Sequence, residues 1–316
     1  LLLIKKNKPL DSLLVKESER LIRSQRYTRS VTSEMKVVSG DSVDVYIRVL
    51  DSWSLVPDVS SSTTKSKFYL KEKNIFGLGH EFSNSYTKSL TNKDNGYSIN
   101  YFIPTIRNTF ISTRLNYEID LDRKYDKSII IERPFFSSFA RWAAGVALGQ
   151  NLNKIVTLDV NQNEVIQNSK FNYQDYWAGH AFQIFKGNSE YNRTTNFVTS
   201  ARYYNRNYTE KPIFNSDSLD VYSSEQLYLI SLGITSRKFT QDKNIFNFNV
   251  VEDIASGFVY NLTTGYRKRY DDYKFYAGGR VALGDYFKFG YLSGNLEFGT
   301  FLESGKTNQT ATSLRL

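Results

Sequence analysis

Two histidines and one adjacent pair of carboxylates are the groups in this sequence whose types could support catalysis or metal binding. His80 and His180 lie far apart along the chain, and there is no cysteine, so nothing supplies the ligand spacing of a zinc site. Structural roles are expected for both histidines. Glu252 and Asp253 follow Val251 at the expected start of a strand, which explains them better as polar residues at a strand end than as an acid/base pair.

The sequence also lacks the motifs that bind phosphate or activate a serine nucleophile. Gly77 and Gly79 are separated by one residue, but the third glycine of a dinucleotide-binding loop is missing. No Gly-x-Ser-x-Gly segment is present. We therefore expect a protein that is not an enzyme and uses neither a metal ion nor a cofactor.

The composition suits strands that face two different environments. The mean hydropathy is −0.45, and no apolar run reaches the length of about 18 residues that a transmembrane helix needs. There are 23 Tyr and 22 Phe, and a phenol can place its ring in lipid and its hydroxyl at the headgroups. The net charge of +9 comes from Lys and Arg scattered singly, so a wet barrel interior or anionic headgroups explain it better than nucleic acid.

From residue 66 onward, long segments alternate apolar and polar residues, most clearly in 108–122, 256–267, 274–284 and 291–302. They run for roughly 9–15 residues, which suits tilted membrane strands. The opposite register carries Arg, Glu, Gly and Ser, while Tyr and Phe gather near the strand ends. We therefore expect the polar face to line a wet interior and the apolar face to meet lipid. The expected lipid-facing residues include Leu115, Tyr117, Tyr260, Leu262, Leu296 and Phe298.

The connections are expected to alternate between short turns, as at 103–106 and 134–137, and longer polar loops, as at 151–170 and 205–218. Only five prolines in 316 residues also favour sheets. The predicted fold class is mainly β: a transmembrane antiparallel β-barrel of about twelve or thirteen visible strands, incomplete, preceded by a small α+β domain.

Residues 1–57 form that small domain. A short strand is expected at 1–5, and a helix from an N-cap at Asp11 to about Gln25. A hairpin follows, with strands around 29–38 and 43–49. The strand at 29–38 either accepts a client strand along an exposed edge, by backbone pairing, or is an ordinary paired strand. The residues of the client-binding edge would be Val31, Ser33, Met35 and Val37.

Three segments, in this order and spacing, carry a resemblance to a known family. They are 17–23 (ESERLIR), 49–55 (VLDSWSL) and 74–81 (NIFGLGHE), and the Asn-x-Phe-Gly-x-Gly turn in the last is the most specific. The chain resembles the BamA/TamA-type outer-membrane assembly family, in which periplasmic POTRA domains precede a laterally gated β-barrel. The resemblance covers essentially the whole chain.

This resemblance implies a POTRA-like periplasmic domain at 1–57 and an outer-membrane barrel at 58–316 in a Gram-negative bacterium. The implied function is to fold and insert client β-barrel proteins through a lateral gate. The implied partners are outer-membrane lipid, client β-barrels and accessory lipoproteins of a multi-subunit complex, without nucleic acid. The first barrel strand, expected near 66–73, would line the gate with the first turn, through Phe68, Leu70, Asn74, Phe76, Gly77 and Gly79.

The chain departs from the family pattern in two places. No Arg-Gly pair of the family's lumen motif occurs, and the sequence ends at Leu316 without a terminal aromatic strand. Both are expected if the closing strands follow Leu316. Two alternatives stay open: a translocation pore of the same family that exports a secreted partner or surface lipoprotein, and a soluble β-rich carbohydrate-binding protein.

Overall fold

The computed structural model describes the chain apart from residues 41, 160, 214–220, 246–249, 271 and 304. The first elements are the helix α1 (Ser12–Arg23) and the strands β1 (Thr28–Ser39) and β2 (Ser42–Asp51). The remaining elements are β3 (Leu55–Ser61), β4 (Lys65–Ile75), β5 (His80–Ser89), β6 (Asn95–Ile103), β7 (Ser112–Ile119), β8 (Tyr125–Arg133), β9 (Trp142–Leu158), β10 (Glu164–Gln183), α2 (Glu190–Thr194), β11 (Thr195–Glu210), β12 (Glu225–Lys243), β13 (Val251–Arg269), β14 (Asp272–Phe287), β15 (Gly290–Glu303) and β16 (Lys306–Arg315).

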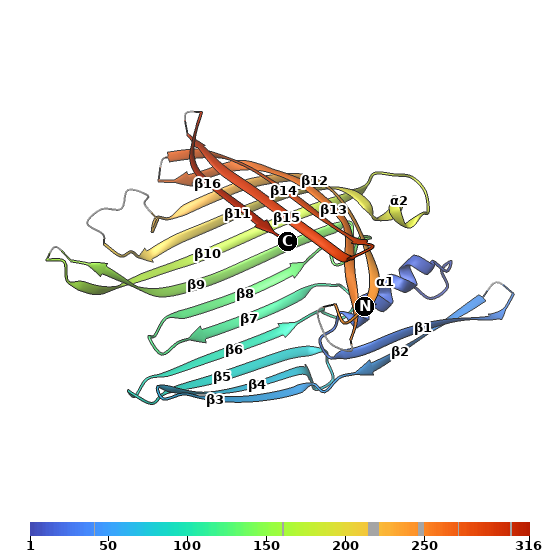
Figure 1. Ribbon diagram of the computed structural model, residues 1–316, viewed down its shortest axis with the longest axis horizontal. Helices are drawn as coiled ribbons and strands as arrows, with labels where there is room; N and C mark the ends of the chain where they lie inside the picture. Colours follow the sequence, from blue (N-terminus) through green and yellow to red (C-terminus); the bar gives the residue numbers. More distant parts are fainter. Residues whose placement is uncertain (41, 160, 214–220, 246–249, 271, 304) are drawn as a thin grey trace.

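Strands β3 to β16 form one antiparallel sheet in which each strand pairs with its neighbours in sequence (Figure 1). The described residues therefore form a mainly β fold, with fourteen strands in this sheet where twelve or thirteen were expected. Within the described residues the sheet is curved but not closed into a barrel, because β3 and β16 form its two edges and do not pair. Segment 151–170, expected to be a loop, belongs mostly to the long hairpin of β9 and β10, in which Leu158 pairs with Glu164.

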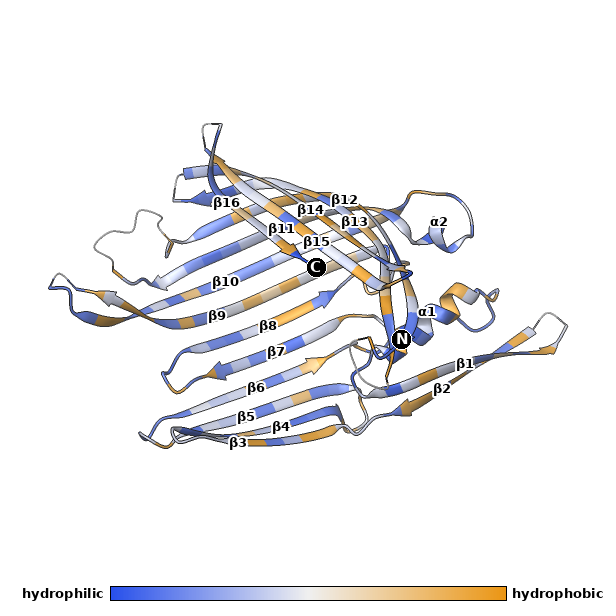
Figure 2. Ribbon diagram, viewed as in Figure 1, coloured by the Kyte–Doolittle hydropathy of each residue, from blue (hydrophilic) through white to orange (hydrophobic). Residues whose placement is uncertain are grey.

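The sheet has two chemically different faces, and Figure 2 shows polar and apolar residues alternating along its strands. Directly paired residues share a face, so Tyr260, Val281 and Leu296 form one row across β13, β14 and β15. We call the face that carries this row the apolar face. The opposite face, which carries the row Asn261, Arg280 and Glu297, is the polar face.

Glycines on the polar face make room for large aromatic side chains. A Cβ built on Gly145 would lie 2.3 Å from Nε1 of Trp177, and one on Gly149 would lie 2.4 Å from the ring of Tyr173. Each glycine lies directly opposite its aromatic residue on the neighbouring strand, since Gly145 pairs with Trp177 and Gly149 pairs with Tyr173. The rings therefore lie flat across the strands, and the polar face is packed although it carries many hydrophilic groups.

The N-terminal unit consists of α1 and the two-stranded hairpin of β1 and β2, as expected from the sequence. Asp11 caps the helix by accepting hydrogen bonds from the backbone N–H groups of Leu13 and Leu14, at 3.1 and 3.4 Å. The prediction of a strand at residues 1–5 is wrong, because these residues form no strand. Leu3 instead donates its N–H to Oγ of Ser18 in α1, at 2.8 Å, so the helix takes up a backbone group that a sheet would have paired.

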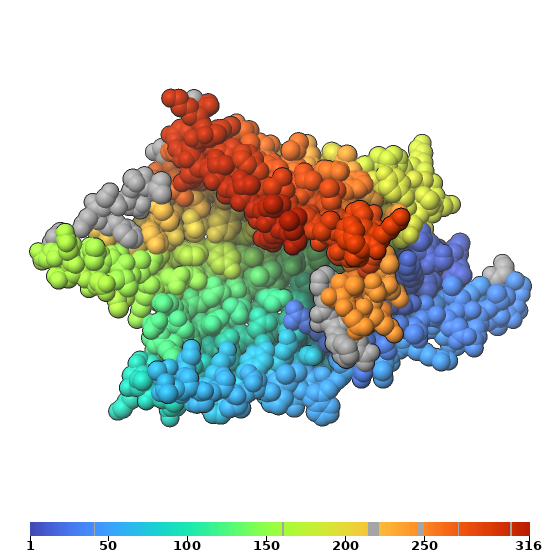
Figure 3. Space-filling view, in the orientation of Figure 1, coloured from blue at the N-terminus to red at the C-terminus, as the bar shows by residue number. Residues whose placement is uncertain are grey.

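The unit lies at one end of the large sheet, where Figure 3 shows it in blue beside the orange strands β12 and β13. Among the described residues, no helix is both long and apolar enough to cross a membrane.

Candidate functional site at the junction of the helix and the sheet

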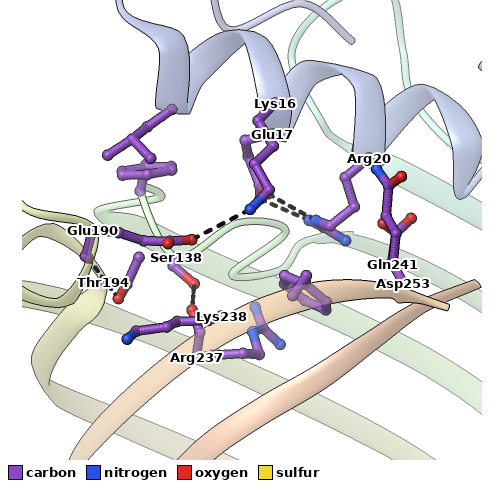
Figure 4. A pocket seen from close by; sticks show the side chains of 13 residues that line it. Lys16, Glu17, Arg20, Ser138, Glu190, Thr194, Arg237, Lys238, Gln241 and Asp253 are labelled. Atoms are coloured by element: carbon purple, nitrogen blue, oxygen red, sulfur yellow. Dashed lines mark hydrogen bonds and ion pairs between the residues drawn. The ribbon is translucent and has the colours of Figure 1, made fainter. Parts of the chain in front are cut away.

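The N-terminal helix meets the sheet at a junction built from four distant parts of the chain. They are α1, the loop 134–141 between β8 and β9, the short helix α2, and adjoining parts of β12 and β13 (Figure 4). A narrow cavity of about 30 Å³ remains between them. Most of the side chains that line it are charged, so ion pairs decide how the N-terminal unit sits on the sheet.

A bidentate ion pair fixes the C-terminal turn of α1 to β13. Nη1 of Arg23 donates to both carboxylate oxygens of Asp253, at 2.6 and 2.7 Å. Arg23 also donates to Glu19 on its own helix. The side chain of Arg23 is only 5% exposed and that of Asp253 only 14%, so solvent screens this pair weakly.

One turn earlier, Arg20 contacts both the loop and β12. It donates to the two carboxylate oxygens of Glu17, each at 2.8 Å, and to the carbonyl of Phe136 at 2.9 Å. Its guanidinium lies 4.1 Å from the ring centre of Phe239, and that of Arg237 lies 5.4 Å from the same centre. Phe239 therefore binds two cations, one from the N-terminal unit and one from the sheet.

The loop 134–141 is held in place by hydrogen bonds to strands from the far half of the sheet. Oγ of Ser138 donates to the carbonyl of Arg237 at 2.9 Å, and Nδ2 of Asn196 donates to the carbonyl of Ser138 at 3.0 Å. The ring of Phe136 stacks on Phe110 at 3.8 Å. The sequence predicted only a short turn here, because the partners of the loop lie 58 and 99 residues away, in β11 and β12.

Two further ion pairs join the start of α1 to α2 and its surroundings. Arg193 contacts Asp11 at 2.7 Å, and Lys16 contacts Glu190 at 3.9 Å. The hydrogen bond from Arg193 holds the pKa of Asp11 below its ordinary value, and the backbone N–H groups of the helix act in the same direction. Asp11 therefore both caps the helix and binds it to α2.

The predicted first turn lies beside this junction, at residues 74–79 between β4 and β5. Asn74, Phe76, Gly77 and Gly79 all lie in it, so the structure brings these four expected residues together. Phe68 and Leu70 lie in β4 and are exposed on the apolar face.

The prediction that β4 is the first strand of the sheet is wrong by one strand. β3 begins at Leu55, and its seven residues pair with the outer side of β4. The sheet thus begins before the expected boundary at residue 57. Pro57 lies within β3, and a proline is disfavoured in a strand that must donate on both sides, so the alternation pattern alone did not indicate a strand here.

The expected client-binding edge lies on β1 and has two unlike halves. Val31 is buried against α1, and Oγ of Ser33 donates to Glu19 at 2.7 Å. Met35 and Val37 are exposed, because the hairpin extends beyond the helix. Within its two-stranded sheet β1 pairs with β2 alone, so its other edge meets no strand among the described residues.

The six residues expected to face lipid share the apolar face and are all exposed. Leu262 is the most exposed of them, at 72%. The register from β7 to β15 carries the same face across the sheet, from Leu115 through Ile129 to the rows on β13, β14 and β15. The six residues are Leu115, Tyr117, Tyr260, Leu262, Leu296 and Phe298.

The groups that could have supported catalysis make structural contacts. Nδ1 of His80 and the hydroxyl of Tyr101 are 2.7 Å apart, and His180 lies edge-on to Trp142 at 4.1 Å. Asp253 binds Arg23, and Glu252 accepts a hydrogen bond from the N–H of Ile245 at 3.1 Å. Among the described residues, these four side chains thus take part in contacts that hold the sheet and its junction with α1 together.

These features define a mainly β protein: an open, two-faced antiparallel sheet with a helix and a hairpin docked at one end. No protein-family model matches the chain, and no curated protein is similar to it.

Proposed function

We propose that this chain is part of an outer-membrane β-barrel assembly factor of the BamA/TamA type. In this proposal β3 to β16 form most of the wall of a transmembrane barrel, and α1 with the hairpin forms a POTRA-like periplasmic unit. The observation that carries the proposal is the two-faced sheet: large apolar side chains are exposed along one face of consecutive strands, and charged and amide side chains line the other. A sheet in water would cover such an apolar face.

Aromatic residues near both ends of the apolar face support a membrane position. Toward one end, Tyr203 lies 6.3 Å from Tyr176 and 5.0 Å from Tyr228 on the neighbouring strands. Toward the end that carries the N-terminal unit, His180 lies 4.1 Å from Trp142 and 4.2 Å from Phe182. Two such rows, with aliphatic residues between them, are typical of strands that cross a bilayer.

Strand length is consistent with the same position. β9 to β14 have between 16 and 20 residues each, which exceeds the roughly 9–11 residues that span the hydrocarbon core. In this proposal the excess would extend from the membrane as hairpins, and Figure 1 shows the β9–β10 hairpin reaching beyond the neighbouring strands.

The unpaired edges support an assembly role within this proposal. An edge strand offers free backbone groups, and in hydrocarbon each unsatisfied group costs several kcal/mol, so β3 and β16 require partner strands. Client β-barrel proteins would pair transiently at such an edge, and accessory lipoproteins and the N-terminal unit would deliver them. A translocation pore of the same family would use the same wall to export a partner.

Depletion of the protein in its host tests the assembly role. Depletion is expected to lower the amounts of outer-membrane β-barrel proteins. In a separate measurement, an unfolded barrel client is expected to insert faster into liposomes that hold the purified full-length protein than into empty liposomes. Unchanged barrel levels and unchanged insertion would contradict assembly. Loss of one secreted partner alone would favour translocation instead.

A further inference from the structure

Three large apolar side chains are exposed at one corner of the molecule, outside the strands. Phe76 is 91% exposed, Trp53 is 81% exposed and Leu78 is 63% exposed. Trp53 lies in the connection between β2 and β3, and the other two lie in the turn 74–79. We call these three residues the rim patch.

The turn that carries Phe76 and Leu78 is held by hydrogen bonds. The N–H of Gly77 donates to the carbonyl of Asn74 and that of Leu78 to the carbonyl of Ile75, each at 3.0 Å. The N–H of Gly79 donates to Oδ1 of Asn74 at 2.7 Å. Phe76 adopts a φ of +52°, which is uncommon for an aromatic residue, so its outward direction is imposed by the turn.

Tyr27 brings Trp53 to the same corner. A Cβ built on Gly79 would lie 3.3 Å from the ring of Tyr27, so this ring lies against the turn. The carbonyl of Tyr27 accepts a hydrogen bond from the N–H of Ser52 at 2.6 Å, and the carbonyl of Ser54 accepts one from the N–H of Lys73 at 3.0 Å. Ser52 and Ser54, the two residues that flank Trp53, are thus hydrogen-bonded to Tyr27 and Lys73, which lie beside the turn.

The rim patch continues the apolar face. Leu55, Pro57 and Val59 share one face of β3. Pro57 and Val59 pair with Leu70 and Phe68, which are exposed on the apolar face of β4, and Leu55 pairs with Glu72. Trp53 lies two residues before Leu55, at the end of this row.

The charged groups near the turn belong to the other face of the sheet. Arg26 and Lys71 share the carboxylate of Glu81, at 2.7 and 3.2 Å, close to where the turn enters β5. Glu81 pairs with Phe102, and Phe102 pairs with Arg114, so this cluster lies on the polar face. These ion pairs therefore do not lie in the exposed apolar row that the rim patch continues.

We propose that the rim patch inserts into the boundary between headgroups and acyl chains of the leaflet next to the N-terminal unit. This inference rests on the proposed membrane position of the sheet and adds a lipid contact outside the strands. Trp and Phe favour this depth of a bilayer, and a rigid turn loses little conformational entropy when its side chains enter lipid. The contact fixes the height of the N-terminal unit above the membrane.

Lipid-depth quenching of single fluorescent labels tests the proposal in the full-length protein. Phe76→Cys and Leu78→Cys would each carry an environment-sensitive label, in vesicles of phosphatidylethanolamine and phosphatidylglycerol with spin-labelled lipids. Val38→Cys is the matched control, because Val38 is also an exposed apolar residue but lies on the hairpin that extends away from the sheet. Leu115→Cys and Leu296→Cys report on the apolar face itself. The signal of the unsubstituted protein after the same labelling is subtracted.

The expected result is quenching at 76 and 78 that is about twofold stronger with the spin label near the headgroup than near the chain end, and little quenching at 38. If the labels at positions 115 and 296 are quenched while the label at 76 behaves like the one at 38, the rim patch does not enter lipid. In that case this inference is wrong, but the proposed membrane position of the sheet is supported. If 76 is shielded from aqueous iodide but not quenched by lipid, a protein covers the patch and the inference is again wrong. If 115 and 296 are not quenched, the membrane position itself fails.

Discussion

Arg23 and Asp253 join the helix α1 to strand β13 across 230 residues of sequence, with both carboxylate oxygens accepting from one guanidinium nitrogen at 2.6 and 2.7 Å. Both side chains are largely buried, and Glu19 binds the same arginine from the helix. Such a pair is costly to break from one side, because the remaining charge stays buried without its partner. The position of the N-terminal unit thus depends on this contact more than on exposed pairs around it.

We expect Arg23→Gln to loosen the N-terminal unit from the sheet. Loss of the cation leaves Asp253 and Glu19 close together without their shared partner, at a cost of about 3–5 kcal/mol. Hydrogen exchange of the α1 amides in the full-length protein measures the loosening as faster exchange. Arg26→Gln is the control, because its side chain is 51% exposed and its partner Glu81 keeps Lys71 as a second cation at 3.2 Å. Equal exchange in the two variants would contradict the importance of the buried pair.

Acid should release the first turn of α1 through Asp11. The pKa of this carboxyl is held below its ordinary value of 3.8 when folded, chiefly by Arg193, so its contribution is complete above pH 3.8 and disappears as the pH falls through the folded pKa. Hydrogen exchange of the first-turn amides across an acid series follows the loss. Asp11→Asn keeps an N-cap side chain without the charge, so its exchange should depend less on pH in this range. The same acid dependence in both proteins would assign the effect to other carboxylates.

The strand pattern was the part of the fold that the sequence predicted well. The apolar registers of 256–267 and 274–284 lie on one face of β13 and β14, as alternation predicts, because a side-chain period of two is a local property of a strand. The helix with its Asp11 cap and the turn beginning at Asn74 were also predicted, since each has a local signature.

The junction could not be predicted in the same way. Arg23 and Asp253 are ordinary charged residues in the sequence, and only the curvature of fourteen strands brings them together. β3 was missed because Pro57 interrupts the strand pattern. At a sheet edge, however, the missing N–H has no neighbouring strand to leave unpaired, so the proline is tolerated there.

Gly149→Ala should destabilise the sheet by about 1–3 kcal/mol, because the new methyl would overlap the ring of Tyr173, only 2.4 Å from a Cβ at this position. Denaturant unfolding in detergent, followed by the change in electrophoretic mobility without heating, measures the effect. Gly279→Ala is the matched control, since its nearest neighbour is Cδ2 of Leu262 at 3.6 Å, an ordinary contact. In a Tyr173→Ala background the alanine at 149 should cost much less. If Gly149→Ala lowers the free energy of unfolding by the same amount in that background, overlap with the Tyr173 ring is not the cause of the destabilisation.

Phe76→Asn should stabilise the fold while removing the apolar contact that we propose with lipid. Phe76 has a φ of +52° and is 91% exposed, so asparagine relieves backbone strain worth about 1 kcal/mol and loses almost no packing. Phe110 is a matched control, because its φ is +60° but its ring stacks on Phe136 at 3.8 Å. Phe110→Asn should therefore destabilise the protein, since lost stacking outweighs relieved strain.

Thermal unfolding of both variants in detergent micelles measures the two opposite shifts, and a label at Leu78→Cys in the Phe76→Asn background reports the lipid contact. We expect a higher midpoint together with weaker quenching at position 78, since one of the two highly exposed apolar side chains of the turn is gone. A lower midpoint for Phe76→Asn in detergent would contradict the predicted gain from relieved backbone strain. Unchanged quenching at position 78 would show that Phe76 does not share a lipid contact with Leu78.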